Sequence, residues 1–214
     1  MQRRTFLAAS AALAASSGLP MTAIAAETTP LTKPWTGPYG GVPAFDQVKV
    51  SDFVPALTEA MAAERAEVDA IVANKAAPTF DNTILALERA GMANNRVQTV
   101  TDIWSGTLST PAVRAVDTEM APKLAAHGDA ILQNHPLFLR IEAVYNARAS
   151  LTPEQQRLTW VYWNRFVRSG AKLTPAAKTR IAAINQELAG YFDKFSQNLL
   201  ADETDYVLYL SNEC

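Results

Sequence analysis

Apolar residues recur every three or four positions along most of this chain, and that spacing predicts a series of amphipathic helices. The first expected helix begins at Ser51 or Asp52 and ends before Pro78, which disfavours a helical residue in front of it. Another is expected over 96–108, and the longest starts at Pro175. This last helix carries a stripe of apolar residues: Ile181, Ile184, Leu188, Tyr191, Phe195 and Leu199. We expect the stripe to pack against neighbouring helices.

The stretch 78–91 contains its own start and stop signals, so it is predicted to form one complete helix. Thr79 is the expected cap, because its hydroxyl can accept a hydrogen bond from an unpaired backbone N–H of the first turn. Asp81 then places negative charge beside the positive end of the helix dipole. Gly91 can adopt the left-handed conformation that commonly ends a helix.

Three later helices are expected to start alike, with a capping threonine before a proline: Thr110 before Pro111, Thr152 before Pro153 and Thr174 before Pro175. Proline loses nothing at the first helical position, because its missing N–H would be unpaired there anyway. Gln155 can complete a capping box with Thr152. We expect a kink or break at Pro122, inside the helix that starts at Pro111. Asn134 and His135 begin a further helix.

The helical region, 51–205, lies between two stretches of different character. Residues 26–50 are rich in proline and glycine and are expected to form an extended, irregular arm. Residues 206–210 are β-branched and aromatic, which indicates a strand without a partner, so 206–214 are interpreted as a truncated strand and a tail. The predicted fold class is all-α: a curved stack of about seven antiparallel helices after the arm.

Residues 1–25 have the features of an export signal. Arg3 and Arg4 supply positive charge, a short apolar run covers 6–15, and 23–25 is a small-x-small cleavage site. The arginine pair is typical of a twin-arginine signal, with an ordinary secretory signal as the alternative. Both predict export, to a bacterial periplasm. No second apolar stretch approaches the length of a membrane span, so no membrane contact is expected after cleavage.

Charge and cysteine content exclude two further classes of protein. Removing Arg3 and Arg4 from the 19 basic residues leaves 17 against 21 acidic residues, a net charge of −4. A nucleic-acid binder would need a basic surface, so no nucleic-acid partner is expected. The single cysteine is Cys214, which provides neither a disulfide framework nor a thiolate metal site.

The two histidines are the first candidates for chemistry. A catalytic zinc needs three protein ligands and an open position. His127 and His135 are eight residues apart, roughly 12 Å along the axis of a continuous helix, so structural roles are favoured over a metal site. Asp129 lies close to His127 in sequence, but no nucleophile-elbow pattern accompanies the pair. A Ser-His-Asp site is therefore disfavoured.

Two other groups of side chains are candidates for binding or chemistry. An aromatic and basic cluster could hold a peptide or stack on bases, but its members go round a helix, which favours core packing. The cluster comprises Trp160, Tyr162, Trp163, Arg165, Phe166 and Arg168. Three acids, Glu64, Glu67 and Asp69, have near-helical spacing and could serve acid–base chemistry only if buried. We expect them to be solvated.

The stretch 78–91 also has a specific string of residues: Pro-Thr-Phe-Asp-Asn-Thr-Ile, then Ala-Leu-Glu, then Gly91. It resembles the signature near the start of zinc metallopeptidases of the thimet oligopeptidase and peptidyl-dipeptidase (dipeptidyl carboxypeptidase) type. Further ordered matches lie within 121–145, 166–173 and 184–200. The resemblance runs from about 43 to 210 and is strongest to the periplasmic peptidyl-dipeptidases.

The resemblance implies the N-terminal helical wall of a deep channel that admits short peptides. In that family one zinc is held by a His-Glu-x-x-His helix and a further glutamate, and this chain has no such motif. It is therefore interpreted as the N-terminal portion of such an enzyme, inactive as given, with its catalytic domain missing and apolar stripes left bare. No catalytic, cofactor-binding or metal residue is expected within it. The alternative is a non-enzymatic periplasmic helical protein that binds peptides.

Overall fold

The computed structural model describes residues 29–38, 41–206 and 208, and it confirms the predicted all-α fold class. Within those residues the β-structure is a single bridge, between Thr36 and Val42 of the arm. The elements are the 3-10 turn η2 (Phe45–Gln47), α1 (Val50–Ala73), the π-helix η3 (Phe80–Leu85), α2 (Ala86–Arg89), α3 (Met92–Thr107), α4 (Pro111–Leu132), α5 (His135–Asn146), the 3-10 turn η4 (Arg148–Ser150), α6 (Pro153–Arg168) and α7 (Pro175–Asp205).

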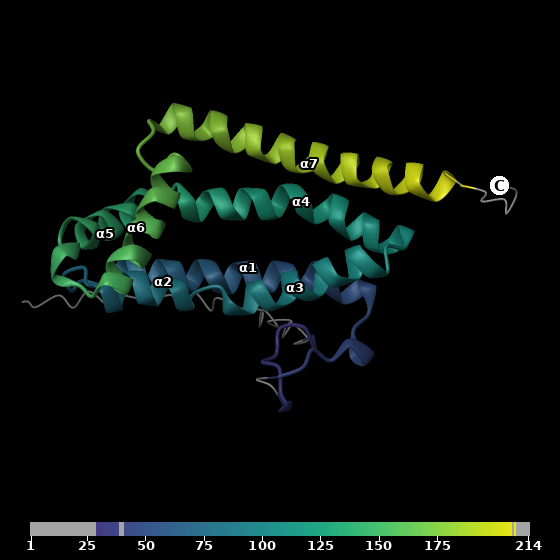
Figure 1. The fold of residues 1–214 in the computed structure, drawn as a ribbon, viewed down its shortest axis with the longest axis horizontal. Coiled ribbons are helices and arrows are strands. Elements are labelled where there is room, and N and C mark those ends of the chain that lie inside the picture. The colour runs from purple at the N-terminus through teal and green to yellow at the C-terminus, as the bar shows by residue number, and fades with distance from the viewer. Residues whose placement is uncertain (1–28, 39–40, 207, 209–214) are drawn as a thin grey trace, which may run out of the picture.

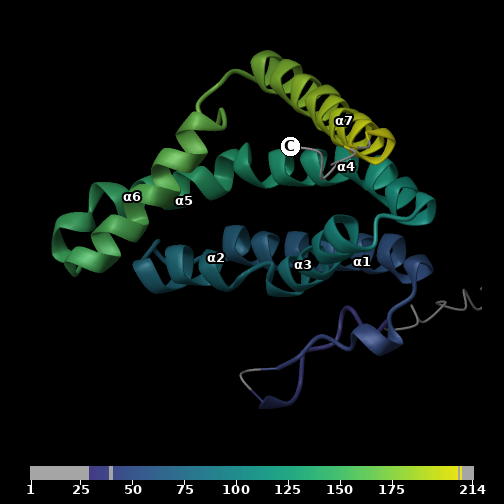
Figure 2. The ribbon, with the colours of Figure 1, turned by 45° about the vertical axis from the view of Figure 1, so that its right-hand side comes forward.

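The helices are stacked in layers. Helices α1 and α3 lie side by side, α4 lies over them, and α7 runs along the outer side of α4 (Figure 1). Helices α5 and α6 pack on each other near the end of α1, and the arm extends from the other end (Figure 2). No helix among the described residues combines the length and apolarity that a bilayer span requires.

The predicted threonine caps are confirmed. The hydroxyls of Thr110, Thr152 and Thr174 accept hydrogen bonds from the backbone N–H three residues further on, at 3.4, 3.3 and 3.4 Å. Gln155 closes the predicted capping box by accepting from the N–H of Thr152 at 3.2 Å. The helix from Asn134 also starts as expected, with the Asn134 side chain capping α5.

Two predicted helix features are wrong. Pro122 lies inside α4 without ending it, so the predicted break is wrong, whereas a kink there stays a prediction. Proline removes one backbone donor, but α4 packs on α1 and on α7, and that packing holds the helix across the missing bond. Helix α1 begins at Val50, before the expected caps. The Asp52 carboxylate instead lies in the first turn, where it accepts from the N–H of Lys49 at 2.8 Å.

The stretch 78–91 has the predicted start and stop but is not one continuous α-helix. Thr79 accepts from the N–H of Asn82 at 3.1 Å, and Asn82 Oδ1 accepts from the N–H of Thr79 at 2.8 Å. The π-helix η3 follows, and then the short α2. Gly91, with φ of 74°, takes the left-handed conformation and leads directly into α3.

The strand predicted over 206–210 lies largely outside the described residues. Within them, Tyr206 follows α7 with extended backbone angles and is exposed. The structure therefore leaves that prediction open.

Arg140 of α5 joins the end of α1 to η3. Its side chain is buried and donates to the carbonyl oxygens of Asn74 and Ala76, at 2.8 and 3.3 Å, and to Asn82 Oδ1 at 3.1 Å. Asn82 thus serves both the helix cap and a tertiary contact. This gives the signature segment a structural role, independent of any chemistry.

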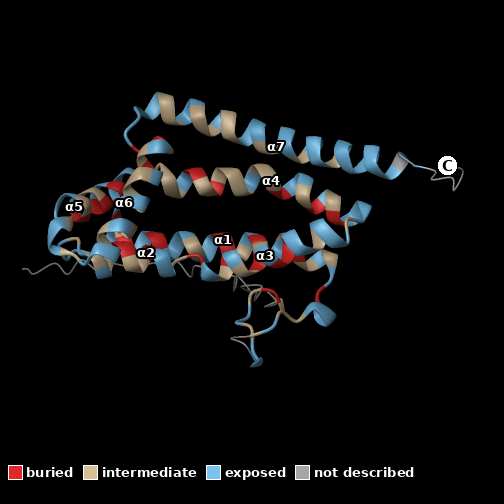
Figure 3. Cartoon of the chain, viewed as in Figure 1, coloured by how far each residue is buried: buried red, intermediate tan, exposed pale blue. Residues whose placement is uncertain are grey.

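The core consists of two hydrophobic clusters. One joins the first half of α1 to α3 and α4 around Phe53 and Leu57. The other joins the last part of α1 to η3, α5 and α6 around Val68 and Phe138. Helix α7 belongs to neither cluster: no residue of it whose burial the structure describes is buried (Figure 3).

We predict that Arg140→Ala lowers the free energy of unfolding by about 2–3 kcal/mol, because it removes a buried side chain and the charged hydrogen bonds that join the end of α1 to η3. Chemical denaturation followed by circular dichroism measures the change. The matched control is Arg180→Ala, at an exposed position of α7, which should change stability by less than about 0.5 kcal/mol. Equal effects of the two substitutions would contradict the role assigned to Arg140.

Candidate functional site

A polar cluster lies on α1 between the two hydrophobic clusters. Its centre is the carboxylate of Glu64, whose Oε2 is 2.8 Å from His127 Nε2 of α4 and 2.6 Å from Asn94 Nδ2 of α3. A carboxylate only accepts hydrogen bonds, so both nitrogens donate to it. His127 is 7% exposed and Asn94 4%, so the cluster joins three helices in the interior.

Gly91 makes room for this carboxylate. A Cβ atom at Gly91 would lie 2.4 Å from Glu64 Oε1, closer than any side chain tolerates. The backbone N–H of Gly91 donates to Glu67 Oε2 at 2.7 Å, so a second glutamate of α1 holds the residue that precedes α3. The left-handed φ and the close approach both require glycine here.

The electrostatics of Glu64 follow from these contacts. The hydrogen bond from His127 lowers the pKa of Glu64 below its ordinary value of 4.5. Burial opposes this shift, while Asn94 and the charges of His127 and Arg165 add to it. The ionised carboxylate is therefore the form that the fold stabilises.

A cavity of about 320 Å³ adjoins the cluster, where α1, α2, α3, α4 and α6 meet. Beside Glu64 and His127, its polar lining includes Glu88, Tyr162 and Arg165. The hydroxyl of Tyr162 donates to the carboxylate of Glu88. Burial, and next the hydrogen bond to Glu88, raise the pKa of Tyr162, so the phenol stays protonated.

The cavity lacks the parts of a nucleophilic site. Among the described residues, the His127 ring forms its hydrogen bond with Glu64, and no hydroxyl or thiol bonds to the ring. His127 Nδ1 is buried without a hydrogen-bond partner. A base needs a nucleophile within hydrogen-bond reach, so this arrangement is structural or ligand-binding in kind.

The histidines do not fit a catalytic zinc. His127 already bonds Glu64 through Nε2, and His135 is exposed at the start of α5. No group of three or more His, Cys, Asp or Glu side chains in the described part of the chain is placed to hold a metal ion. Zinc catalysis needs three such ligands, so no step through zinc is assigned to these residues.

The structure separates the predicted His127 and Asp129 pair. Asp129 Oδ1 accepts from Asn185 of α7 at 2.8 Å and from Gln133 at 3.2 Å. It therefore ties α4 to α7 and does not orient His127.

The expectation that the three acids of α1 are solvated is wrong for Glu64, which is partly buried, and holds for Glu67 and Asp69, which are exposed. Glu64 bonds to α3 and α4, and Glu67 bonds to Gly91 before α3. The spacing of acids along one helix does not tell which partners cover it, so sequence reasoning missed this cluster. The presence of Gly91 was the one available signal of a close approach.

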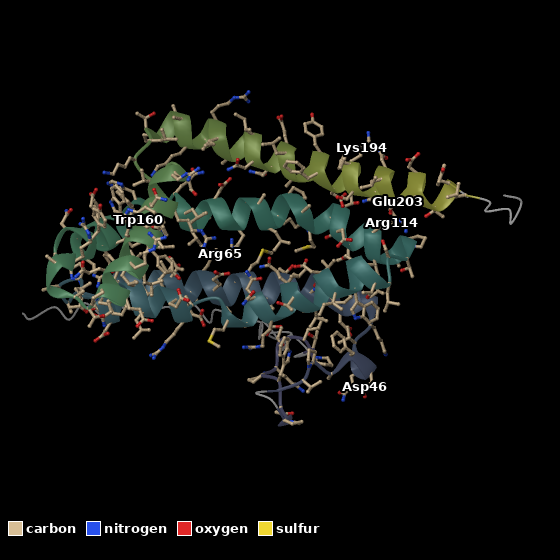
Figure 4. The ribbon with its side chains drawn as sticks, in the orientation of Figure 1. Asp46, Arg65, Arg114, Trp160, Lys194 and Glu203 are labelled. Atoms are coloured by element: carbon tan, nitrogen blue, oxygen red, sulfur yellow. The ribbon has the colours of Figure 1, made fainter. Side chains whose placement is uncertain are left out.

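The aromatic cluster of α6 is only partly packed. Phe166 is 1% exposed, and Trp163 stacks on Tyr145 with ring centroids 4.2 Å apart. Trp160, labelled in Figure 4, is 37% exposed, with the guanidinium of Arg157 4.4 Å from its ring centroid. The predicted core packing thus holds for one side of the helix, and Trp160 lies at the surface.

Comparison with known proteins identifies the class as peptidase-related. The chain is 37% identical over 176 residues to the dipeptidyl carboxypeptidase of Salmonella typhimurium, which covers 81% of this chain and 26% of the relative. It is 38% identical over 161 residues to the dipeptidyl carboxypeptidase of Escherichia coli, 74% of this chain and 24% of the relative. No family model matches the chain.

The family resemblance recognised in the sequence is thereby confirmed: this chain is related to the dipeptidyl carboxypeptidases. It spans about a quarter of the length of the curated relatives that it matches. What those enzymes do as whole proteins is therefore a matter for proposal here.

We predict that Glu64→Gln destabilises the chain most near neutral pH. Because folding lowers the pKa of Glu64, its contribution to stability is fully present above about pH 4.5 and is lost as pH falls through the lowered pKa. The difference in unfolding free energy between wild type and variant should shrink between about pH 6 and pH 3.

The matched control is Asp69→Asn, which removes an exposed carboxylate from the same helix. Urea unfolding at each pH measures both differences. A Glu64→Gln difference that grows on acidification would contradict the assigned pairing.

Proposed function

We propose that this chain is the N-terminal, non-catalytic portion of a zinc-dependent peptidyl-dipeptidase that hydrolyses short peptides. The observation that supports the proposal most is the identity of 37% over 176 residues, which make up only 26% of the relative. The zinc and the groups that activate water would lie in the polypeptide beyond this quarter. The helices described here would form part of the wall around the peptide.

Two features of the chain agree with the proposal. The donor set for zinc is not assembled among the described residues, so chemistry would have to come from elsewhere. Residues 1–25 have the charge and apolar run of an export signal, so the site of action proposed is the periplasm. No nucleic-acid partner is proposed, because the chain without that signal is acidic. No membrane partner is proposed either, because no second apolar stretch in the sequence approaches the length of a span.

A second candidate function is a non-enzymatic protein that binds peptides. The cavity beside Glu64 favours it, because Arg165 and Glu88 offer opposite charges in one lining, as the two ends of a short peptide would need. In this case the isolated chain binds a fluorescently labelled tripeptide without cleaving it, and Arg165→Ala weakens that binding.

A chimera tests the first proposal. The segment of the Escherichia coli relative that matches this chain is replaced by the corresponding residues of this chain. We expect the chimera to release dipeptides from the carboxyl end of a short peptide, with loss of activity on chelation of zinc and recovery on its return. The isolated chain should hydrolyse nothing.

The native relative serves as the positive control. Hydrolysis by the isolated chain would contradict the assignment of a non-catalytic portion. A folded, zinc-loaded chimera without activity would contradict the assignment of a substrate-channel wall.

A further inference from the structure

Polar side chains attach helix α7 to α4, beside a few half-buried apolar residues such as Ile181 and Ile184. Asn185 donates to Asp129 of α4 at 2.8 Å, and Gln197 donates to the hydroxyl of Thr118 of α4 at 2.8 Å. The Thr118 hydroxyl lies 2.9 Å from Asp193 Oδ2 and donates to it. These bonds, spread along the helix, fix its rotation about its own axis.

Another face of α7 is apolar and bare. Leu188, Phe192, Phe195 and Leu199 follow one another at intervals of four, three and four residues, so they form a single stripe along the helix. Their exposed fractions are 43, 67, 65 and 48%. We call these four residues the α7 stripe. A contiguous apolar patch of this kind marks an interaction surface.

The end of α7 carries unbalanced negative charge. Asp202 and Glu203 lie in its last turn, which contains no basic residue. Neither is in an ion pair with any described residue. Acids are unfavourable at the negative end of a helix dipole, so a cation from outside would stabilise this end. Figure 4 labels Glu203 and, nearer the middle of the helix, Lys194.

The length of the relatives indicates which polypeptide could cover the α7 stripe. The relatives extend over roughly four times the length that this chain matches. A stripe at three–four spacing is the surface that another amphipathic helix recognises. The acidic end of α7 selects a partner with basic residues at that end.

We propose that the α7 stripe is the docking surface for a helix of the polypeptide that the relatives carry beyond the matched quarter. This helix presents an apolar stripe of its own, with Lys or Arg beside Asp202 and Glu203. The inference rests on the proposed function and names the partner that it requires. The α7 stripe would be covered only when that polypeptide is present.

The test compares one double variant in two settings. Phe195→Glu with Leu199→Glu is placed in the isolated chain and in the chimera with the Escherichia coli relative. Because the stripe is bare in the isolated chain, its Tm should change by less than about 2 °C, whereas that of the chimera should fall by about 5 °C or more. Met92→Glu with Leu139→Glu, at exposed apolar positions on α3 and α5, is the matched control and should move neither.

Three results would overturn the inference. The first is an equal fall in both settings, since the stripe would then already be covered. The second is no fall in either setting. The third is an isolated chain that sediments as a dimer and becomes a monomer in the stripe variant, since a second copy would then be the occupant.

A second measurement tests the inference if the chimera fails to fold. The same two substitutions are made at the aligned positions of the intact Salmonella enzyme, where they should also lower Tm by about 5 °C or more. An unchanged Tm there would overturn the docking surface. Peptide hydrolysis is read separately, so a stable but inactive chimera refutes the proposed function and leaves the docking surface standing.

Discussion

The hydrogen bonds between α4 and α7 determine which face of α7 is exposed to solvent. Asp129 and Thr118 of α4 form hydrogen bonds with polar residues of α7. These bonds attach the 31-residue helix α7, although none of its side chains whose burial the structure describes is buried. Each such bond contributes only about 1 kcal/mol, far less than a buried apolar stripe would. These hydrogen bonds help to position α7 while the α7 stripe stays exposed.

The packing of the remaining helices depends on α1 and on the Glu64 carboxylate that it carries. Two hydrophobic clusters meet along α1, and the Glu64 carboxylate between them is satisfied by donors from α3 and α4. Gly91 allows that carboxylate to fit, and Arg140 fixes the other end of the signature segment. The most specific residues of the family signature therefore explain packing.

Local signals in the sequence predicted local structure well. The caps at Thr110, Thr152 and Thr174 depend on residues within three positions, so they could be read directly. The Glu64 and His127 pair joins residues 63 positions apart, which no periodicity reveals. Pro122 misled because packing on both sides of α4 outweighs one lost bond. The prediction that the apolar residues of this helix pack on neighbouring helices is wrong for four of them, Leu188, Tyr191, Phe195 and Leu199, which are exposed. Spacing alone does not say which apolar residues a neighbouring helix covers.

Hydrogen exchange of the isolated chain tests the central claim most directly. Protection reflects how much packing must be lost before an amide opens, and α7 lacks the apolar packing that α1 has. Mass spectrometry of the monomeric chain should show the amides of α7 exchanging far faster than those of α1 and α4. Protection of α7 equal to that of α1, in a sample shown to be monomeric, would contradict a helix that is attached without a fully buried side chain among those whose burial the structure describes.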